Sequence, residues 1–291
     1  MKFVPLSLPA ARRDIESLHE FLLQCKKLFV LTGAGISTPS GIPDYRSEGV
    51  GLYARSKDRP VQYQDFLKHA HVRQRYWARN FVGWPRFSSF LPNSAHLKLA
   101  EWERCGLVHS LVTQNVDALH YKAGSHKVIE LHGSSHRVEC LQCKRIVPRV
   151  AIQRQIERDN PHWHAEIVGS MAPDGDIQLS QDQVKDFKVP VCSHCDGILK
   201  PQIIFFGDNV PKPIVENIYS RLTESDSILV LGSSLQVFSG YRFLRAGKEQ
   251  GKSIAIVNIG PTRADNIADV KVDAECVEVL QEITLKDVGI S

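Results

Sequence analysis

Four of the seven cysteines stand in two C-x-x-C pairs, Cys140/Cys143 and Cys192/Cys195. Four thiolates satisfy tetrahedral Zn²⁺ and leave no open position, which is the character of a structural site. The 48 residues between the two pairs exceed the roughly 12–20 residues of common zinc modules, so the fold must bring the pairs together. One structural Zn²⁺ is predicted, and unmetallated or disulfide-forming cysteines are the alternative.

An apolar run at 28–31 leads into a glycine-rich turn, Gly33-Ala34-Gly35. Two glycines one residue apart permit a close backbone approach that a Cβ would block, so main-chain N–H groups can face a pyrophosphate near a helix N-terminus. The pattern indicates a dinucleotide. It is not the hydride-transfer fingerprint, because Thr38 stands where a third glycine belongs and no strand ending in an acidic residue follows about 20 positions on.

Further short motifs follow this turn in a fixed order. They are Gly-Ile-Pro-Asp-Tyr-Arg at 41–46, Gln-Asn-Val-Asp at 114–117, Leu-His-Gly at 131–133, the cysteine pairs, Gly-Ser-Ser-Leu-Gln-Val at 232–237 and Asn-Ile-Gly at 258–260. The ordered set resembles the sirtuins, which are NAD-consuming protein deacylases. With Tyr-Trp-Ala-Arg at 76–79, the sequence is most similar to the mitochondrial class II sirtuins.

The resemblance implies that NAD is a co-substrate bound along these motifs. Arg46 is expected on a mobile loop, where a cation near the pyrophosphate is useful, and Cys276 is expected against the adenine. The full set of implied cofactor contacts is Gly33, Ala34, Gly35, Ser37, Ile42, Pro43, Asp44, Tyr45, Arg46, Gln114, Asn115, Asp117, Gly232, Ser233, Ser234, Asn258, Ile259, Gly260 and Cys276.

The same resemblance implies that NAD is cleaved at its nicotinamide ribose bond while an acyl-lysine carbonyl oxygen attacks the anomeric carbon. This reaction needs a base beside the ribose hydroxyls, and His132 is the candidate because an imidazole titrates near neutral pH. Asn115 and Asp117 follow a strand and are expected to hydrogen-bond the ribose and the nicotinamide carboxamide. A helix N-cap is the plainer alternative for Asp117.

Three positions depart from the family pattern. Tyr45 replaces the usual Phe beside the nicotinamide, Asp208 replaces the Glu of a Phe-Gly-Glu motif at the peptide groove, and Phe-Ser-Gly-Tyr at 238–241 replaces a Pro-containing continuation. The cofactor half of the site is therefore expected to be intact and the peptide half altered. Ordinary acetyl-lysine is expected to be a poor substrate.

Tyr76 and Arg79 lie three residues apart in a helix-like stretch, so both should project from one face. A phenol donor beside a guanidinium suits a carboxylate, and class II sirtuins with this pair take acyl groups that bear an acid. An acidic acyl group longer than acetyl is therefore expected. A lipoyl- or biotin-like chain held by apolar contact with Trp77 or Tyr53 is an alternative, and an exposed arginine with a half-buried tyrosine is the plainer one.

The alternation of apolar runs with helix-like stretches predicts an α/β fold with a Rossmann-like, doubly wound parallel sheet. The runs are 28–31, 107–112, 200–206, 228–231 and 254–257, and the helix-like stretches are 14–25, 94–104, 212–222 and 239–250. The resemblance assigns 1–47, 94–133 and 200–291 to a discontinuous NAD-binding domain. A helical module at 48–93 and a zinc module at 134–199 are expected to form an inserted small domain, with the active cleft between the lobes.

A long insertion separates the cysteine pairs at about 160–189. It contains a turn signal at 172–176 and a possible capping box, Ser180 with Gln183. The insertion is longer than the sirtuin zinc module usually carries, so we expect it to reach the acyl channel. A surface excursion is the alternative.

Composition is compatible with these expectations. The chain has 291 residues, 43% of them hydrophobic, and a net charge of +4, so neither nucleic acid nor a membrane is an expected partner. No apolar run approaches the roughly 18 residues of a membrane span. Residues 1–13 hold three cations and no acid, which suits the remnant of a transit peptide, while the resemblance implies the mitochondrial matrix. Cys25 and Cys105 are expected in the core.

Three functions compete. The first is an NAD-dependent protein-lysine deacylase that acts on acylated proteins or peptides, with metabolic enzymes as the expected substrates. The second is mono-ADP-ribosyl transfer from NAD to protein. The third is a non-catalytic NAD or ADP-ribose sensor, which His132 argues against because binding alone needs no base.

Overall fold

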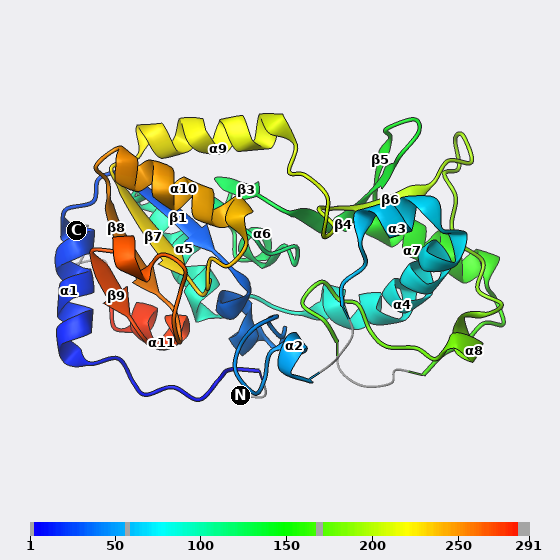
Figure 1. The fold of residues 1–291 in the computed structure, drawn as a ribbon, viewed down its shortest axis with the longest axis horizontal. Coiled ribbons are helices and arrows are strands. Elements are labelled where there is room, and N and C mark those ends of the chain that lie inside the picture. The colour runs from blue at the N-terminus through cyan, green and yellow to red at the C-terminus, as the bar shows by residue number, and fades with distance from the viewer. Residues whose placement is uncertain (1–2, 56–58, 167–170, 285–291) are drawn as a thin grey trace.

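Two sheets organise residues 3–55, 59–166 and 171–284, the parts of the chain that the computed structural model describes (Figure 1). The strands are β1 (Leu28–Thr32), β2 (Val108–Thr113), β3 (Val128–Glu130), β4 (Gly133–Cys140), β5 (Ile146–Pro148), β6 (Leu199–Ile203), β7 (Ser227–Leu231), β8 (Ser253–Val257) and β9 (Val270–Val272). Six of them form one parallel sheet and three form a smaller antiparallel one.

Eleven α-helices and two 3₁₀ helices within the described residues connect and cover these strands. The helices are α1 (Arg12–Leu23), η1 (Ala34–Ser40), α2 (Leu52–Arg55), α3 (Tyr63–Lys68), α4 (Ala70–Ser89), α5 (Ser94–Arg104), α6 (Leu119–Lys122), α7 (Arg149–Asp159), α8 (Gln181–Val184), α9 (Lys212–Glu224), α10 (Phe238–Glu249), η2 (Asp265–Ile267) and α11 (Cys276–Gln281). None of these helices is both long and apolar enough to cross a bilayer.

The parallel sheet has the strand order β3-β2-β1-β7-β8-β9 and is covered on both faces. Side chains of β1 alternate between two cores: Leu28 and Val30 pack with α1, α5 and α11, whereas Phe29 and Leu31 pack with α9 and α10. Strands β1 and β7 are buried along their whole length, as expected for a sheet covered on both faces. The predicted Rossmann-like α/β fold is confirmed.

The antiparallel sheet has the order β5-β4-β6 and lies in the smaller lobe with α3, α4, α7 and α8 (Figure 1). Strand β6 pairs only with β4 among the described strands, with Cys140 opposite Leu199. The expectation that the apolar run 200–206 belongs to the parallel sheet is therefore wrong. A buried strand has the same apolar composition in either sheet, so the run alone did not identify its partner.

The small lobe has a hydrophobic core of its own. Residues from α3 and α4, including Phe66 and Trp77, pack with Val138 of β4, Ile152 of α7 and Phe187 of the insertion. Segments 48–93 and 134–199 thus share one core. The predicted turn at 172–176 and the predicted capping box that opens α8 are both present.

Gly83 of α4 lets the insertion pack directly on the helix. A Cβ at Gly83 would lie 2.2 Å from the carbonyl oxygen of Gly175 and 3.2 Å from Ile177 Cγ2. Gly175 itself adopts a left-handed φ of 85°, which glycine tolerates best. The insertion is held against α4 by a backbone approach that only a glycine allows.

Gly83→Ala is expected to lower the free energy of unfolding by about 1–3 kcal/mol, because overpacking the contact outweighs the gain in helix propensity. Urea unfolding and the rate of proteolytic cleavage within 160–189 measure the effect. Ser89→Ala, at an exposed position of the same helix, is the control. An unchanged unfolding midpoint with an unchanged cleavage rate would contradict the assigned packing.

Candidate active site and zinc centre

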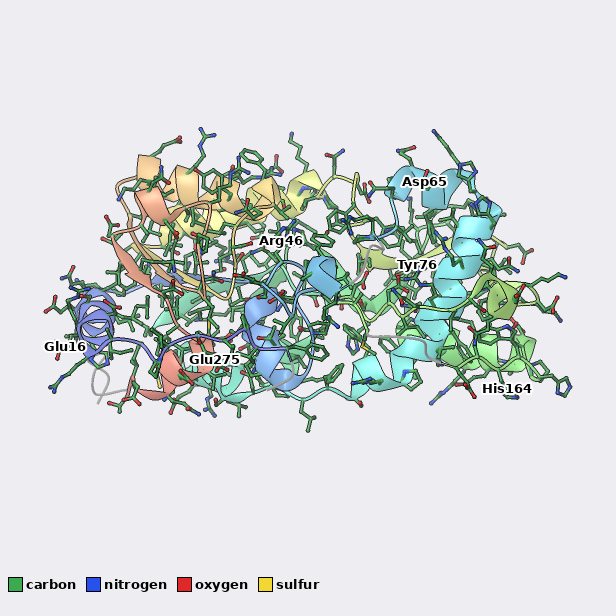
Figure 2. All side chains as sticks on the ribbon, turned by 60° about the horizontal axis from the view of Figure 1, so that its bottom comes forward. Glu16, Arg46, Asp65, Tyr76, His164 and Glu275 are labelled. Atoms are coloured by element: carbon green, nitrogen blue, oxygen red, sulfur yellow. The ribbon has the colours of Figure 1, made fainter. Side chains whose placement is uncertain are left out.

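A cavity of about 1070 Å³ lies at the carboxyl ends of the parallel strands. Figure 2 labels three residues that line it, Arg46, Tyr76 and Glu275, which come from the loop after η1, from α4 and from the position before α11. Both lobes therefore contribute to its wall. This is where open α/β sheets bind their ligands.

The structure gathers nearly all the predicted site residues around this cavity. The cofactor set lines it except for Pro43, which is buried, and the predicted base His132 lines it as well. Of the two predicted acyl contacts, Tyr76 lines the cavity, whereas Arg79 lines a small neighbouring hollow.

The three glycines Gly33, Gly35 and Gly232 pack on one another. A Cβ at Gly35 would lie 2.9 Å from the Gly232 oxygen, and a Cβ at Gly232 would lie 2.3 Å from the Ile36 nitrogen. The Gly33 N–H donates to Leu231 and the Gly35 N–H donates to Gly232. These two glycine N–H groups are therefore engaged within the chain, and the expectation that main-chain N–H groups of this turn face a pyrophosphate stays a prediction for its other residues.

Ser37 joins two of the predicted catalytic residues. Its buried hydroxyl donates to Asp117 Oδ2 at 2.7 Å and accepts from Asn115 Nδ2 at 3.1 Å, while the same amide also donates to the Gly33 oxygen. Burial raises the pKa of Asp117, although hydrogen bonds from Leu119 and Ser37 lower it. Asp117 also accepts a hydrogen bond from the Leu119 N–H, but the N-cap of α6 is Ala118, so the N-cap alternative for Asp117 is wrong.

The His132 imidazole is held at both nitrogens. Its Nδ1 donates to the Gln114 carbonyl oxygen at 3.0 Å, and its Nε2 lies 2.8 Å from Ser239 Oγ. Burial lowers the pKa of His132 to about 4, more than the hydrogen bond to Gln114 raises it. The neutral tautomer with hydrogen on Nδ1 leaves a lone pair on Nε2, which is the requirement for a base.

Aromatic side chains surround Tyr45, which lines the cavity at the position where the sirtuin resemblance implies a phenylalanine. The Tyr45 ring lies 5.7 Å from that of Tyr53 and 6.0 Å from that of Phe206. Burial raises the pKa of Tyr45 well above its ordinary value, so the phenol stays neutral. The Arg46 guanidinium lies 5.6 Å from the centre of the Tyr53 ring, within the range of a cation–π contact.

Cys276 lies in the wall of the cavity and is buried. Burial raises the pKa of its thiol to about 12, and the thiol donates to the Val257 oxygen. It is therefore a packing contact and not a nucleophile. Cys25 is buried as expected, but Cys105 is exposed, because it follows α5 at the turn before Gly106; the expectation of a core position for Cys105 is wrong.

Arg79 is paired with the insertion. Its Nη2 lies 2.8 Å from Asp176 Oδ2, and its Nε donates to the Ile177 oxygen. Arg79 therefore already has a carboxylate partner within the chain, without any acidic acyl group. Burial raises the pKa of Asp176 to about 7 despite the opposing effect of Arg79, because desolvation of the carboxylate outweighs the nearby positive charge.

The insertion reaches the cavity, as expected. Pro173, Asp174 and Asp176 line its wall, and Ile177 packs with Phe87 of α4. Residues 167–170 of the insertion lie outside the described residues. The length of the insertion and its turn signal predict a binding loop. No local feature of the sequence shows that Asp174 and Asp176 are the residues of this loop that line the cavity.

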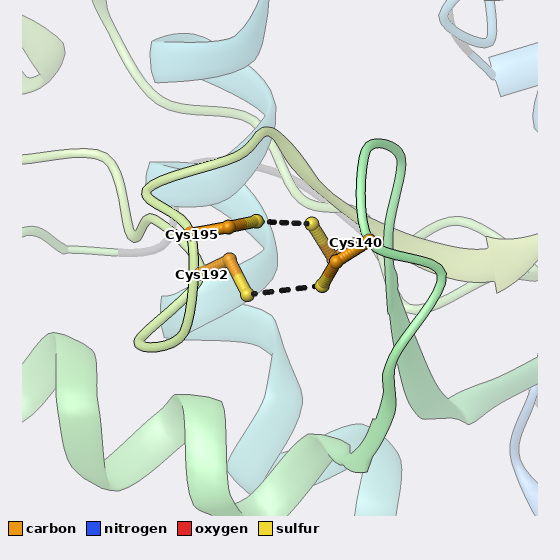
Figure 3. Close-up of side chains that lie close together, drawn as sticks. Cys140, Cys192 and Cys195 are labelled. Atoms are coloured by element: carbon orange, nitrogen blue, oxygen red, sulfur yellow. Dashed lines mark hydrogen bonds between the residues drawn. The ribbon is translucent and has the colours of Figure 1, made fainter.

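The two cysteine pairs meet as predicted (Figure 3). Cys140 Sγ lies 3.5 Å from Cys195 Sγ, Cys143 Sγ lies 3.7 Å from Cys192 Sγ, and all four sulfurs lie within 4.8 Å of one another. The backbone turns alike after each pair, with Lys144 and Asp196 both in the left-handed region. Four converging thiol groups fit one tetrahedral, structural Zn²⁺.

This combination of a parallel sheet, a glycine-lined cavity, a neutral histidine and a four-cysteine module defines the class of protein. The chain belongs to the Sir2 family, whose model matches residues 33–239. The predicted resemblance to the sirtuins is confirmed. It also extends to the mitochondrial members, as individual relatives show.

The chain is 55% identical over 278 residues to the "NAD-dependent protein lipoamidase sirtuin-4, mitochondrial" of Bos taurus, covering 96% of this chain and 88% of that protein. It is 50% identical to the "NAD-dependent protein deacylase Sirt4" of Drosophila melanogaster, covering 97% and 90%. A solved structure of Sir2 with a p53 peptide and NAD⁺ superposes with a TM-score of 0.72 at 28% identity, covering 95% of this chain and 99% of that one.

Cys195→Ser is expected to lose Zn²⁺ and to unfold the small lobe, because structural zinc contributes about 10–16 kcal/mol of apparent binding free energy in zinc-finger peptides. Metal analysis and thermal unfolding measure both effects. Cys105→Ser, which removes an exposed thiol outside the cluster, should keep the metal. Active protein that contains no zinc would contradict the assignment.

His132→Ala is expected to bind NAD as the parent does and to lower turnover by about 10²-fold or more, the scale of a positioned base. Calorimetric titration with NAD and a nicotinamide-release assay separate binding from chemistry. His71→Ala, at an exposed position of α4, is the control. Turnover near the parent rate would show that His132 is structural.

Proposed function

We propose that this chain is an NAD-dependent protein-lysine deacylase that releases nicotinamide and forms O-acyl-ADP-ribose. One observation carries the proposal: a neutral imidazole, His132, presents its Nε2 lone pair within the cavity that also holds Asn115 and Asp117. Family membership supports it. A sensor would gain nothing from a base held in this tautomer.

The residues of the cavity fit NAD. Glycine contacts keep the loops after β1 and β7 together, and Asn258, Ile259 and Cys276 line the cavity next to the end of β8 and the start of α11. When bound, NAD supplies an electrophilic anomeric carbon and nicotinamide as the leaving group. His132 would take a proton from a ribose hydroxyl at Nε2, while Asn115 and Asp117 would orient the ribose and the carboxamide.

Acylated proteins or peptides are the proposed second substrate. Solved structures similar to this chain include Sir2 bound to an acetylated peptide and a Sir2 protein bound to a propionylated peptide. We infer the mitochondrial matrix as the location, because two relatives carry "mitochondrial" in their names. Metabolic enzymes of that compartment are then the proposed protein substrates.

The proposed acyl group is longer than acetyl. The insertion and Tyr76 extend the cavity wall into the small lobe, and relatives from Bos taurus and Homo sapiens are named lipoamidases. A lipoyl-like chain would contact this wall without needing a counter-ion. An acidic chain would have to replace Asp176 as the partner of Arg79, so the two substrate classes depend differently on the insertion.

A panel of lipoyl, biotinyl, glutaryl and acetyl peptides tests the function by nicotinamide release and mass spectrometry. Free lysine plus O-acyl-ADP-ribose is expected, with acetyl the poorest substrate. Addition of ADP-ribose to protein in place of deacylation would favour the transferase alternative. Absence of NAD consumption with every peptide and protein tested would overturn the enzymatic proposal.

Asp176→Asn is expected to raise kcat/KM for a glutaryl peptide by about tenfold, because it frees Arg79 for a charge-assisted hydrogen bond worth about 1.5–3 kcal/mol. In the parent, Asp176 is increasingly protonated as pH falls below its pKa of about 7 and then neutralises Arg79 less. The ratio of glutaryl to lipoyl activity should therefore rise from pH 8 to pH 6 in the parent and stay level in the variant.

Asp182→Asn, an exposed carboxylate of the same insertion, is the matched control and should behave as the parent. Lipoyl activity should change less than twofold in either variant. If Asp176→Asn left the glutaryl rate and its pH dependence unaltered, Arg79 would have no part in acyl recognition.

A further inference from the structure

Ser239 is the described residue that occupies the lone pair of the proposed base. Gln114 accepts a hydrogen bond at His132 Nδ1, and a carbonyl oxygen can only accept, so Nδ1 carries the hydrogen. In the neutral ring Nε2 must then be the acceptor. The contact of 2.8 Å between Nε2 and Ser239 Oγ is therefore a hydrogen bond donated by the serine hydroxyl.

The location of Ser239 makes this contact notable. It is the second residue of α10, so it lies inside the first turn of the helix, past the N-cap position that serine prefers. The N-cap of α10 is Val237, and no side-chain cap hydrogen bond is present there. The Ser239 hydroxyl is turned to the imidazole instead, and both side chains line the cavity.

The first turn of α10 also fixes the other partner of the ring. A Cβ at Gly240 would lie 3.2 Å from the Gln114 side-chain amide, so the glycine lets Gln114 pack directly on the helix. Gln114 Nε2 in turn donates to Ser233 Oγ at 2.8 Å. A continuous set of hydrogen bonds thus runs from Ser233 through Gln114 and His132 to Ser239.

We propose that Ser239 is a positioning residue for His132, whose hydroxyl holds Nε2 as the acceptor nitrogen and fixes the ring plane toward the cavity. This inference rests on the proposed function, because it assigns a task to the proposed base. Ser239 keeps the imidazole in the rotamer and tautomer that a substrate hydroxyl requires. When a substrate hydroxyl donates to His132 Nε2, its hydrogen bond replaces the one from Ser239.

This proposal explains two residues of the motif Phe-Ser-Gly-Tyr at 238–241. Ser239 contributes the donor, and Gly240 contributes the space that Gln114 occupies. A ring held from two opposite nitrogens has little freedom to rotate away from the reacting atoms. Misplacement of a catalytic group by about 1 Å can cost as much as about 10²-fold in rate.

Ser239→Ala, Ser239→Thr and the control Ser220→Ala test the proposal in the full-length protein. Thr keeps the hydroxyl, and Ser220 is an exposed serine of α9 whose hydroxyl donates to Glu224. Loss of one neutral hydrogen bond should lower kcat of Ser239→Ala by roughly three- to tenfold. The KM for NAD should change less than twofold, and Ser239→Thr should restore most of the rate.

A spectroscopic readout tests the contact without any substrate. In ¹⁵N spectra of histidine-labelled protein, with the His132 signals assigned by their loss in His132→Gln, the parent should show a protonated Nδ1 and a hydrogen-bonded imine Nε2. Ser239→Ala should move the Nε2 signal downfield, toward a free imine nitrogen. Ser239→Thr and Ser220→Ala should leave it in place.

Several results would overturn the proposal. These are an unchanged Nε2 signal in Ser239→Ala, an unchanged kcat, no rescue by Ser239→Thr, or a loss confined to the KM for NAD, which would make Ser239 a binding contact. Failure of the parent to consume NAD with any acyl peptide would defeat the proposed function instead. In that case the spectra would still decide whether Ser239 positions the ring.

Discussion

The contact between the loops after β1 and β7 is the constraint on which the site depends. Gly35 and Gly232 meet backbone to backbone, closer than any Cβ would permit. Gly33 accepts the amide of Asn115, and Ser233 accepts that of Gln114, so each loop holds one residue that follows β2. In the sequence these glycines indicate a phosphate-binding turn. In the structure their lack of a Cβ is what allows the two loops to pack together at the site.

Hydrogen bonds connect this contact between the two loops to the proposed base, His132. Gln114 is held by its side chain and receives His132 on its carbonyl oxygen. The small lobe closes the other side of the cavity, where Tyr76 and the insertion carboxylates approach Tyr45. The loops that follow the parallel strands thus hold the proposed catalytic residues, and the small lobe forms the cavity wall that an acyl chain would contact.

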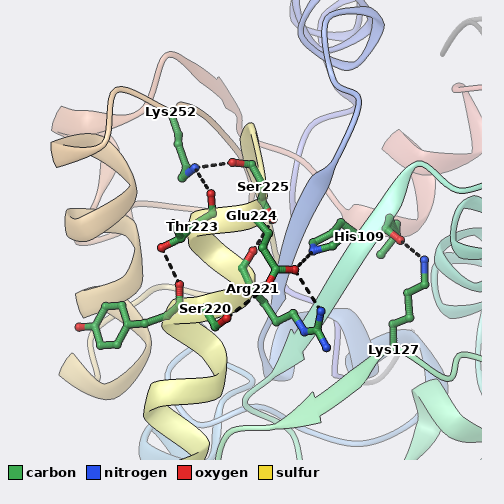
Figure 4. Close-up of polar contacts among 10 residues, drawn as sticks. His109, Lys127, Ser220, Arg221, Thr223, Glu224, Ser225 and Lys252 are labelled. Atoms are coloured by element: carbon green, nitrogen blue, oxygen red, sulfur yellow. Dashed lines mark hydrogen bonds and ion pairs between the residues drawn. The ribbon is translucent and has the colours of Figure 1, made fainter.

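Sequence patterns predicted the parts of the fold that local periodicity and residue type determine. The predicted apolar runs agree with strands β1, β2, β7 and β8, and the two C-x-x-C pairs meet in one cluster. The cofactor contacts that the sirtuin resemblance implies line the cavity apart from Pro43, and their roles stay predictions. Pairing over long distances was not predictable. Strand β6 pairs with β4 in the antiparallel sheet. Asp176 forms an ion pair with Arg79, 97 positions away in the sequence. His109 of β2 forms a hydrogen bond with Glu224 of α9 (Figure 4). Such pairs depend on how elements dock, and no local signal encodes that docking.

Desolvation explains the electrostatic character of the cavity. Burial lowers the pKa of His132 to about 4 and raises that of Asp176 to about 7, and it keeps Tyr45 and Tyr76 neutral. One physical cause therefore has two consequences. It leaves the imidazole unprotonated at neutral pH, ready to accept a proton, and it holds the carboxylate beside Arg79 close to its midpoint of ionisation. A carboxylate partner would raise the pKa of such a base and favour its protonated form, whereas a neutral hydroxyl such as that of Ser239 contacts the ring without adding a charge.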